Sequence, residues 1–96
     1  MCYNKMYALS EPKSGQIVVS RMGHDTGRPY IVVAVVGSDF VLCADGKYRT
    51  LDKPKQKRVK HLKTTGVSQA AAEAIESGKL TDADVRRILA AAFKAQ

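Results

Sequence analysis

The fold is decided by the sequence YIVVAVVGSDFVLCADG at residues 30–46. Residues 30–36 are apolar on both alternating faces, which predicts a central β-strand buried on both sides, as in a small barrel. Gly37-Ser38 favours a two-residue hairpin, residues 39–44 predict the next strand, and Asp45-Gly46 is the strongest hairpin signal in the chain. The stretch therefore predicts antiparallel strands joined by tight turns.

Further strands are expected on either side of this stretch. Residues 16–21 are rich in β-branched side chains and predict a strand before the central one, with a glycine-containing turn between the two. Beyond the Asp45-Gly46 hairpin, residues 47–51 predict a fourth strand and residues 57–62 predict a fifth. Five short strands within about 50 residues favour a compact antiparallel barrel.

Two helices are expected after the strands. Ser68 can cap a helix over Gln69–Ser77, and Gly78 would end it. Thr81 and Asp84 have the spacing of a capping box for a second helix. Its apolar stripe consists of Val85, Ile88, Leu89, Ala92 and Phe93. Such a stripe favours packing on the domain's own core, and a helical hairpin that docks another protein is the alternative.

The 96 residues suffice for one domain, which we divide into a lead-in at 1–14, a barrel at 15–63 and a helical hairpin at 67–96. No apolar run approaches the length of a membrane-spanning helix, and the first residues lack a secretory signal. Cys2 and Cys43 are too few to staple a secreted domain. We therefore expect a cytoplasmic protein without membrane association and without a disulfide.

The net charge of +7 lies in one window of the chain. Residues 46–63 hold eight Lys and Arg against Asp52 alone, and the remaining residues are neutral in sum. An extended segment would project its lysines together, so we expect one continuous basic edge of the barrel. Its expected phosphate-binding residues are Lys47, Arg49, Lys53, Lys55, Lys57, Arg58, Lys60, His61 and Lys63. Counterion release favours phosphate binding to such a row, and a solvated face that only aids solubility is the alternative.

A second phosphate contact is expected at the turn before residue 30. The turn consists of Gly23, His24, Asp25, Thr26 and Gly27 and is followed by Arg28. Backbone N–H groups at the glycines could meet a phosphate beside Arg28. A hairpin loop that needs its glycines only for geometry explains the same residues.

Metal binding and catalysis find little support in the sequence. Cys2, His24, Cys43 and His61 are the candidate metal ligands, but no two have the spacing of a zinc site. No nucleophile motif surrounds any serine, and no pair of carboxylates lies on one strand face. We therefore expect neither an enzyme nor a metal protein.

The sequence GQIVVSRMGHDTGRPYIVV at residues 15–33 resembles a KOW motif, with Gly27 as its hallmark glycine. The continuation, FVL and ADG at residues 40–46 and HLKT at 61–64, is similar to the single-KOW large-subunit ribosomal proteins of the "fourteen-e" family and to their short bacterial relatives. The sequence KLTDADVR at residues 79–86 also resembles the tail of those relatives.

This resemblance implies an SH3-like barrel that binds RNA, ribosomal RNA above all, with neither catalysis nor a cofactor. Ribosomal or transcription proteins are further partners that it implies. Phosphate contacts specify no sequence, so any base preference would come from stacking on Tyr30, Tyr48 or His61. The alternative function is a protein-interaction module of a transcription or translation factor that docks an acidic partner.

Overall fold

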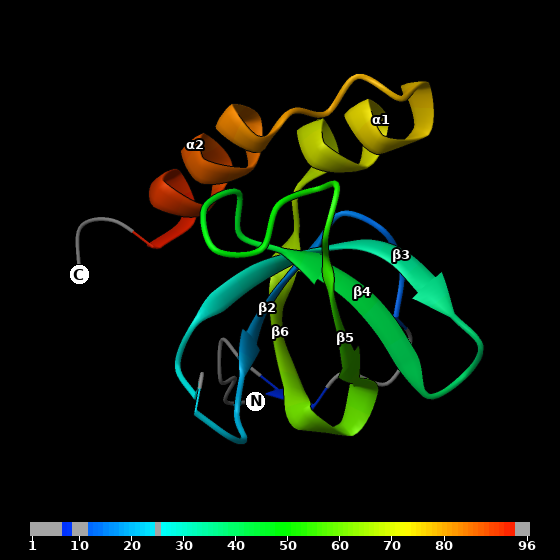
Figure 1. Cartoon of the computed structure of the whole chain (residues 1–96), viewed down its shortest axis with the longest axis vertical. Helices are drawn as coiled ribbons and strands as arrows, with labels where there is room; N and C mark the ends of the chain where they lie inside the picture. The colour runs from blue at the N-terminus through cyan, green and yellow to red at the C-terminus, as the bar shows by residue number, and fades with distance from the viewer. Residues whose placement is uncertain (1–6, 9–11, 25, 94–96) are drawn as a thin grey trace, which may run out of the picture.

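The computed structural model describes residues 7–8, 12–24 and 26–93. Its elements are β1 (Tyr7–Ala8), β2 (Gln16–Ser20), β3 (Pro29–Val36), β4 (Phe40–Ala44), β5 (Lys55–Arg58), the 3-10 turn η1 (Val59–His61), β6 (Leu62–Val67), α1 (Gln69–Ser77) and α2 (Asp82–Phe93). The strands form one antiparallel sheet in the order β1-β6-β2-β3-β4-β5. Both helices lie together at one end of the sheet (Figure 1). Antiparallel strands followed by two helices are therefore confirmed. Most of the lead-in expected at 1–14 lies outside the described residues.

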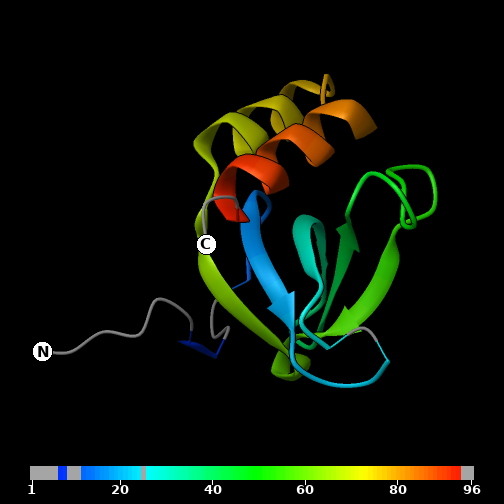
Figure 2. The same cartoon turned by 90° about the vertical axis from the view of Figure 1, so that its left-hand side faces the viewer.

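The sheet curls around an inner apolar cluster. Val18 of β2, Val32 of β3, Val41 of β4 and Leu62 of β6 belong to one buried cluster. These side chains come from four successive strands of the sheet, and the sheet curls, as Figure 2 shows. Among the described strands, the pairings leave β1 and β5 as edges, so the sheet is open.

A second apolar cluster joins the helices to the outer face of the sheet. Ile17 of β2 and Ile31 of β3 pack with Ala71 of α1 and with Val85 and Leu89 of α2. The first half of β3 is thus buried on both faces, as its sequence predicts. Its far end is exposed because the helices cover only one end of the sheet (Figure 2). Within the described residues, no helix has the length and apolar character needed to cross a bilayer.

The helix ends follow the sequence signals closely. The Ser68 hydroxyl accepts a hydrogen bond from the Ala71 N–H at 3.1 Å, and Gly78 closes α1 with a φ of 74°. At the start of α2, the Thr81 N–H donates to the Asp84 carboxylate at 3.2 Å, and the Asp84 N–H donates to the Thr81 hydroxyl at 3.1 Å. Both caps are therefore confirmed.

The predicted hairpin at Asp45-Gly46 and the fourth strand at residues 47–51 are wrong. The chain after β4 forms a loop, and the next strand is β5. The Asp45 carboxylate accepts hydrogen bonds from the N–H groups of Lys47 and Arg49, at 2.9 and 2.8 Å. These bonds fold the chain back on Asp45, so the backbone of residues 47–49 is not extended.

The predicted fifth strand at residues 57–62 is wrong in its middle. β5 ends at Arg58, η1 turns the chain, and β6 begins at Leu62. β5 pairs with β4 at one edge of the sheet, whereas β6 pairs with β2. The turn is required because one straight strand cannot make both pairings.

Candidate functional site

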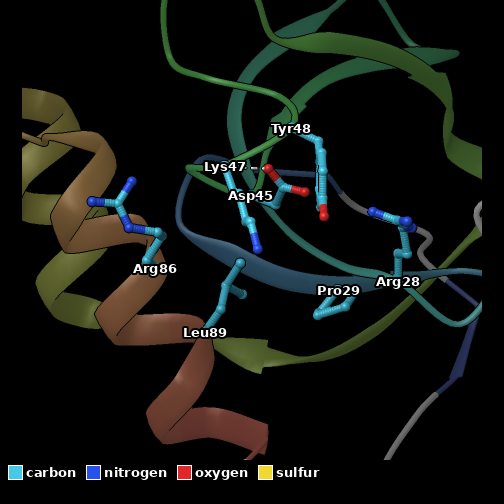
Figure 3. Close-up of a pocket in the computed structure, with 7 residues that line it drawn as sticks. All are labelled: Arg28, Pro29, Asp45, Lys47, Tyr48, Arg86 and Leu89. Carbon is cyan, nitrogen blue, oxygen red and sulfur yellow. Dashed lines mark hydrogen bonds between the residues drawn. The ribbon is translucent and has the colours of Figure 1, made fainter.

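An exposed tyrosine stands between two cations on the surface. Tyr48 is 66% exposed, more than any other large hydrophobic residue that the structure describes. The Arg28 guanidinium carbon lies 4.9 Å from the centre of its ring, and the Lys47 ammonium nitrogen lies 5.2 Å from it. Figure 3 shows the ring edge-on between the two side chains. Cations attract an aromatic face at these distances, which holds the three side chains together.

The loop after β4 presents this tyrosine through a compact backbone turn. The N–H groups of Asp45 and Gly46 both donate to the Arg49 carbonyl, at 2.9 and 3.1 Å. Together with the bonds to the Asp45 carboxylate, they close residues 45–49 into a tight loop. Lys47, Tyr48 and Arg49 are all exposed at its tip.

Helix α2 holds the base of the same loop. The Arg86 guanidinium donates to the Gly46 carbonyl at 2.5 Å, and the Asp82 carboxylate accepts from the Leu51 N–H at 2.8 Å. Gly46 has a φ of 80°, and a Cβ there would lie 2.5 Å from the Asp82 carbonyl oxygen. The loop and the helix are therefore in direct contact, and the glycine makes that contact possible.

Two hollows adjoin Tyr48. The first, of about 220 Å³, is lined by Arg28, Pro29, Asp45, Lys47, Tyr48, Arg86 and Leu89 (Figure 3). The second, of about 280 Å³, is lined by His24, Arg28, Tyr30, Tyr48, Arg49 and Lys55. We call Arg28, Lys47, Tyr48, Arg49 and Lys55 the loop cluster. Four predicted phosphate-binding residues therefore meet around one aromatic ring.

Arg28 belongs to this cluster. The sequence predicted it as a second contact, separate from the basic window. The loop between β2 and β3 brings it over Tyr48 of the basic window, so the two expected contacts form one surface.

The turn before Arg28 uses its glycines for its own geometry. The Thr26 N–H donates to the Gly23 carbonyl at 3.3 Å, and the Gly27 N–H donates to the Ser20 carbonyl at 2.7 Å. Gly23 and Gly27 have φ values of 86° and 91°. Because the Gly27 N–H bonds to the Ser20 carbonyl of β2, the predicted phosphate contact is wrong for this N–H group. His24 is exposed beside the loop cluster, and Asp25 lies outside the described residues.

The remaining basic residues do not continue the same edge. Arg58 and Lys60 line another hollow, with Ser38 and Asp39, at the opposite end of β5 from Lys55. The Arg58 guanidinium carbon lies 5.0 Å from the centre of the Phe40 ring. Lys53 is exposed in the loop before β5. His61 ends η1, and Lys63 of β6 pairs with Val19 of β2; His61 and Lys63 are half-buried. The prediction of one continuous basic edge is wrong.

Lys57 departs furthest from its predicted position. It pairs with Val41, a member of the inner cluster, and is only 8% exposed. Directly opposed residues of antiparallel strands point to the same face, so Lys57 points inward and its neighbour Arg58 outward. The prediction that the lysines of this segment project together is therefore wrong at Lys57.

Comparisons with known proteins give no family. No protein-family model matches the chain, and no curated protein matches it. Function is therefore inferred from the residues and their geometry.

The candidate metal ligands that the structure describes, His24, Cys43 and His61, do not form a group that could hold a metal ion. Within the described residues, no group of three or more His, Cys, Asp or Glu side chains could hold a metal ion. Cys43 is buried in the inner cluster, and Cys2 lies outside the described residues.

Arg86 is the site residue that the sequence did not predict. Charge arithmetic overlooks it because it lies in α2, within a C-terminal region that is neutral in sum. The helical stripe does contain a signal, since Arg86 is flanked by Val85 and lies one turn before Leu89, a buried residue that lines the first hollow. A basic residue beside the buried stripe of a helix lies close to the part of the protein against which that stripe packs.

Proposed function

We propose that this protein binds RNA through the loop cluster. The observation that carries the proposal is the exposed Tyr48 ring between Arg28 and Lys47, with Arg49 and Lys55 beside it. Sites for single-stranded nucleic acids share two elements. Cationic side chains follow the phosphate backbone of the nucleic acid, and an aromatic side chain offers a surface on which bases stack. A surface that served only solubility would not need an exposed aromatic ring at its centre.

The resemblance to KOW proteins supports the same function, with ribosomal RNA as the favoured ligand and binding rather than catalysis as the role. The sheet order supports an SH3-like barrel. Four strands follow one another from β2 to β5, and β6 returns after a 3-10 turn to pair with β2. The curl around the inner cluster also fits a small, partly open barrel. Resemblance and architecture thus agree.

The alternative partner is an acidic protein docked by the barrel edge or by the helices, and docking by the helices has less support. The apolar residues Val85 and Leu89 of α2 are buried against β2 and β3. The stripe that would dock a partner is therefore occupied by the protein's own sheet. Truncating the helices would uncover Ile17 and Ile31, so the two functions are better compared with the full chain.

The salt dependence of RNA affinity tests the proposal. With about four or five phosphates engaged, the slope of log K against log salt should be roughly −3 to −4.5 on a structured RNA. The variant Lys47→Glu/Arg49→Glu should weaken binding and flatten the slope by about 2, because each lost phosphate contact removes about one unit.

Arg58→Glu/Lys60→Glu is the matched control, since it changes net charge equally at the other end of β5. It should leave the slope close to that of the unmodified protein. A slope near zero for the unmodified protein would exclude RNA binding through phosphates. Equal losses in both variants would exclude the loop cluster as the interface. Displacement of RNA by polyglutamate at equal charge concentration would favour the acidic partner.

A further inference from the structure

We propose that the first hollow, between Tyr48 and α2, receives one unpaired base of the bound RNA. The inference rests on the proposed RNA binding and specifies the kind of RNA. The preferred ligand is a strand with a bulged, looped or single-stranded nucleotide. A continuous duplex would be bound through its phosphates alone.

Three apolar surfaces form the walls of this hollow. The Tyr48 ring lies on one side, Leu89 of α2 lies on the other, and Pro29 at the start of β3 lies below the ring in the view of Figure 3. A base has two apolar faces, so it can stack on the tyrosine ring in place of the Lys47 ammonium, which lies 5.2 Å from the ring centre, while its other face contacts the leucine. Stacking on an aromatic side chain accepts any of the four bases because each has a π-face.

The charged groups lie where the rest of a nucleotide would need them. Arg28, Lys47 and Arg86 line the hollow together with Asp45. Arg28 and Lys47 can follow the phosphates on either side of an inserted base, whereas the Arg86 guanidinium is bonded to the Gly46 carbonyl. The Asp45 carboxylate, fixed by the N–H groups of Lys47 and Arg49, repels a phosphate from the interior. A neutral base inside the hollow avoids the Asp45 carboxylate, and phosphates outside it lie near the cationic side chains.

The size of the hollow limits what can enter. Its volume of about 220 Å³ lies below the range of about 300–1,000 Å³ that is typical of sites for drug-sized ligands. One ring system is therefore a better match than a folded peptide segment. A base within a duplex is excluded, because A-form RNA keeps its bases stacked and its deep groove closed to side chains.

An acidic peptide suits this hollow less well than a base. Its carboxylates would pair with Arg28, Lys47 or Arg86, but an acidic side chain offers no flat apolar surface to the ring of Tyr48. The aromatic wall and the position of Asp45 both favour the neutral, planar group.

The experiment compares two RNA duplexes that differ by one base and have the same number of phosphates. One carries a single bulged adenosine, and the other carries an abasic nucleotide at the same bulge. The unmodified protein should bind the bulged base about five- to a hundredfold more tightly, the range expected for one stacked base. Tyr48→Leu should remove this preference, and Tyr48→Phe, which keeps the ring, should retain it. Because Tyr48 is largely exposed, both variants should fold.

A fluorescent base at the bulge gives a second measurement. 2-Aminopurine loses fluorescence when it stacks, so binding of the unmodified protein should quench it and binding of Tyr48→Leu should not. Salt-dependent binding without any preference for the bulged base would overturn the base site and leave the proposed RNA binding intact. Absence of salt-dependent binding to either RNA would overturn both.

Discussion

Gly46 meets two separate requirements at the residue scale. Its φ of 80° lies in the left-handed region, where a side chain costs roughly 1–2 kcal/mol. Its missing Cβ also leaves room for α2, since that atom would lie 2.5 Å from the Asp82 carbonyl oxygen and 2.9 Å from Cγ of Arg86. The loop that carries Tyr48 therefore depends on a glycine for both its shape and its contact with the helix.

Gly37 separates these two requirements, because it has a φ of 66° and a Cβ added there would meet nothing within 4 Å. Gly37→Ala should destabilise the protein by about 1–2 kcal/mol through backbone strain alone. Gly46→Ala should cost about 1–3 kcal/mol more, because the loop or α2 must shift. Urea denaturation of both variants measures the difference. Equal losses would show that α2 does not press on Gly46 in solution.

At the scale of the element, local signals predicted the helices well. Ser68, Gly78 and the Thr81–Asp84 pair act within one helical turn, so their effect depends little on the rest of the fold. The Asp45-Gly46 dipeptide was the strongest hairpin signal in the chain, yet it forms a wider loop closed by the Asp45 carboxylate. This loop is also held by Arg86, which is 40 residues away in the sequence. A distant contact of this kind cannot be detected from local sequence.

The candidate site shows the same limit. The basic window and Arg28 were both predicted, and Tyr48 was named as a base-stacking residue. Their meeting around one ring was not predicted, since it depends on how the two loops and α2 pack. Lys57 was misplaced because the edge strand β5 has an inward face that charge counting does not reveal.

The cap of α2 gives an element-scale prediction about pH. The hydrogen bonds from Arg87 and Thr81 lower the pKa of Asp84 below its ordinary value of 3.8, and Arg87 also forms an ion pair with it at 2.8 Å. A carboxyl whose pKa is lowered by folding stabilises the folded state above its unfolded pKa and loses that effect as pH falls through the folded pKa.

Part of the stability should therefore be lost as the pH falls through and below 3.8, and Asp84→Asn should lack this pH-dependent part. The measurement is the free energy of unfolding of both proteins at several pH values. The difference between them should be largest near neutral pH and shrink on acidification. A difference that stays constant across this range would contradict the role of the ionised Asp84.

At the scale of the whole molecule, the two apolar clusters share the strands β2 and β3. Val18 and Val32 face the inner cluster, while Ile17 and Ile31 face the helices. The helices are thus part of the packing that holds the sheet, and α2 in turn supports the loop cluster. A change in this shared core should reach the sheet, the helices and the loop cluster together.

Ile31→Ala tests this coupling, because Ile31 is fully buried between β3 and the helices. Removing it should cost about 2–5 kcal/mol, the usual range for truncating a buried isoleucine. Val36→Ala, at the exposed end of the same strand, should change stability by less than about 0.5 kcal/mol. The helical far-UV circular dichroism and the signal of the buried Tyr30 should melt together in the unmodified protein and shift together in Ile31→Ala. If the helical signal is lost at a lower temperature than the tyrosine signal of the sheet, residues 15–63 and 67–96 fold as separate units. In that case α2 could not hold the Tyr48 loop in place.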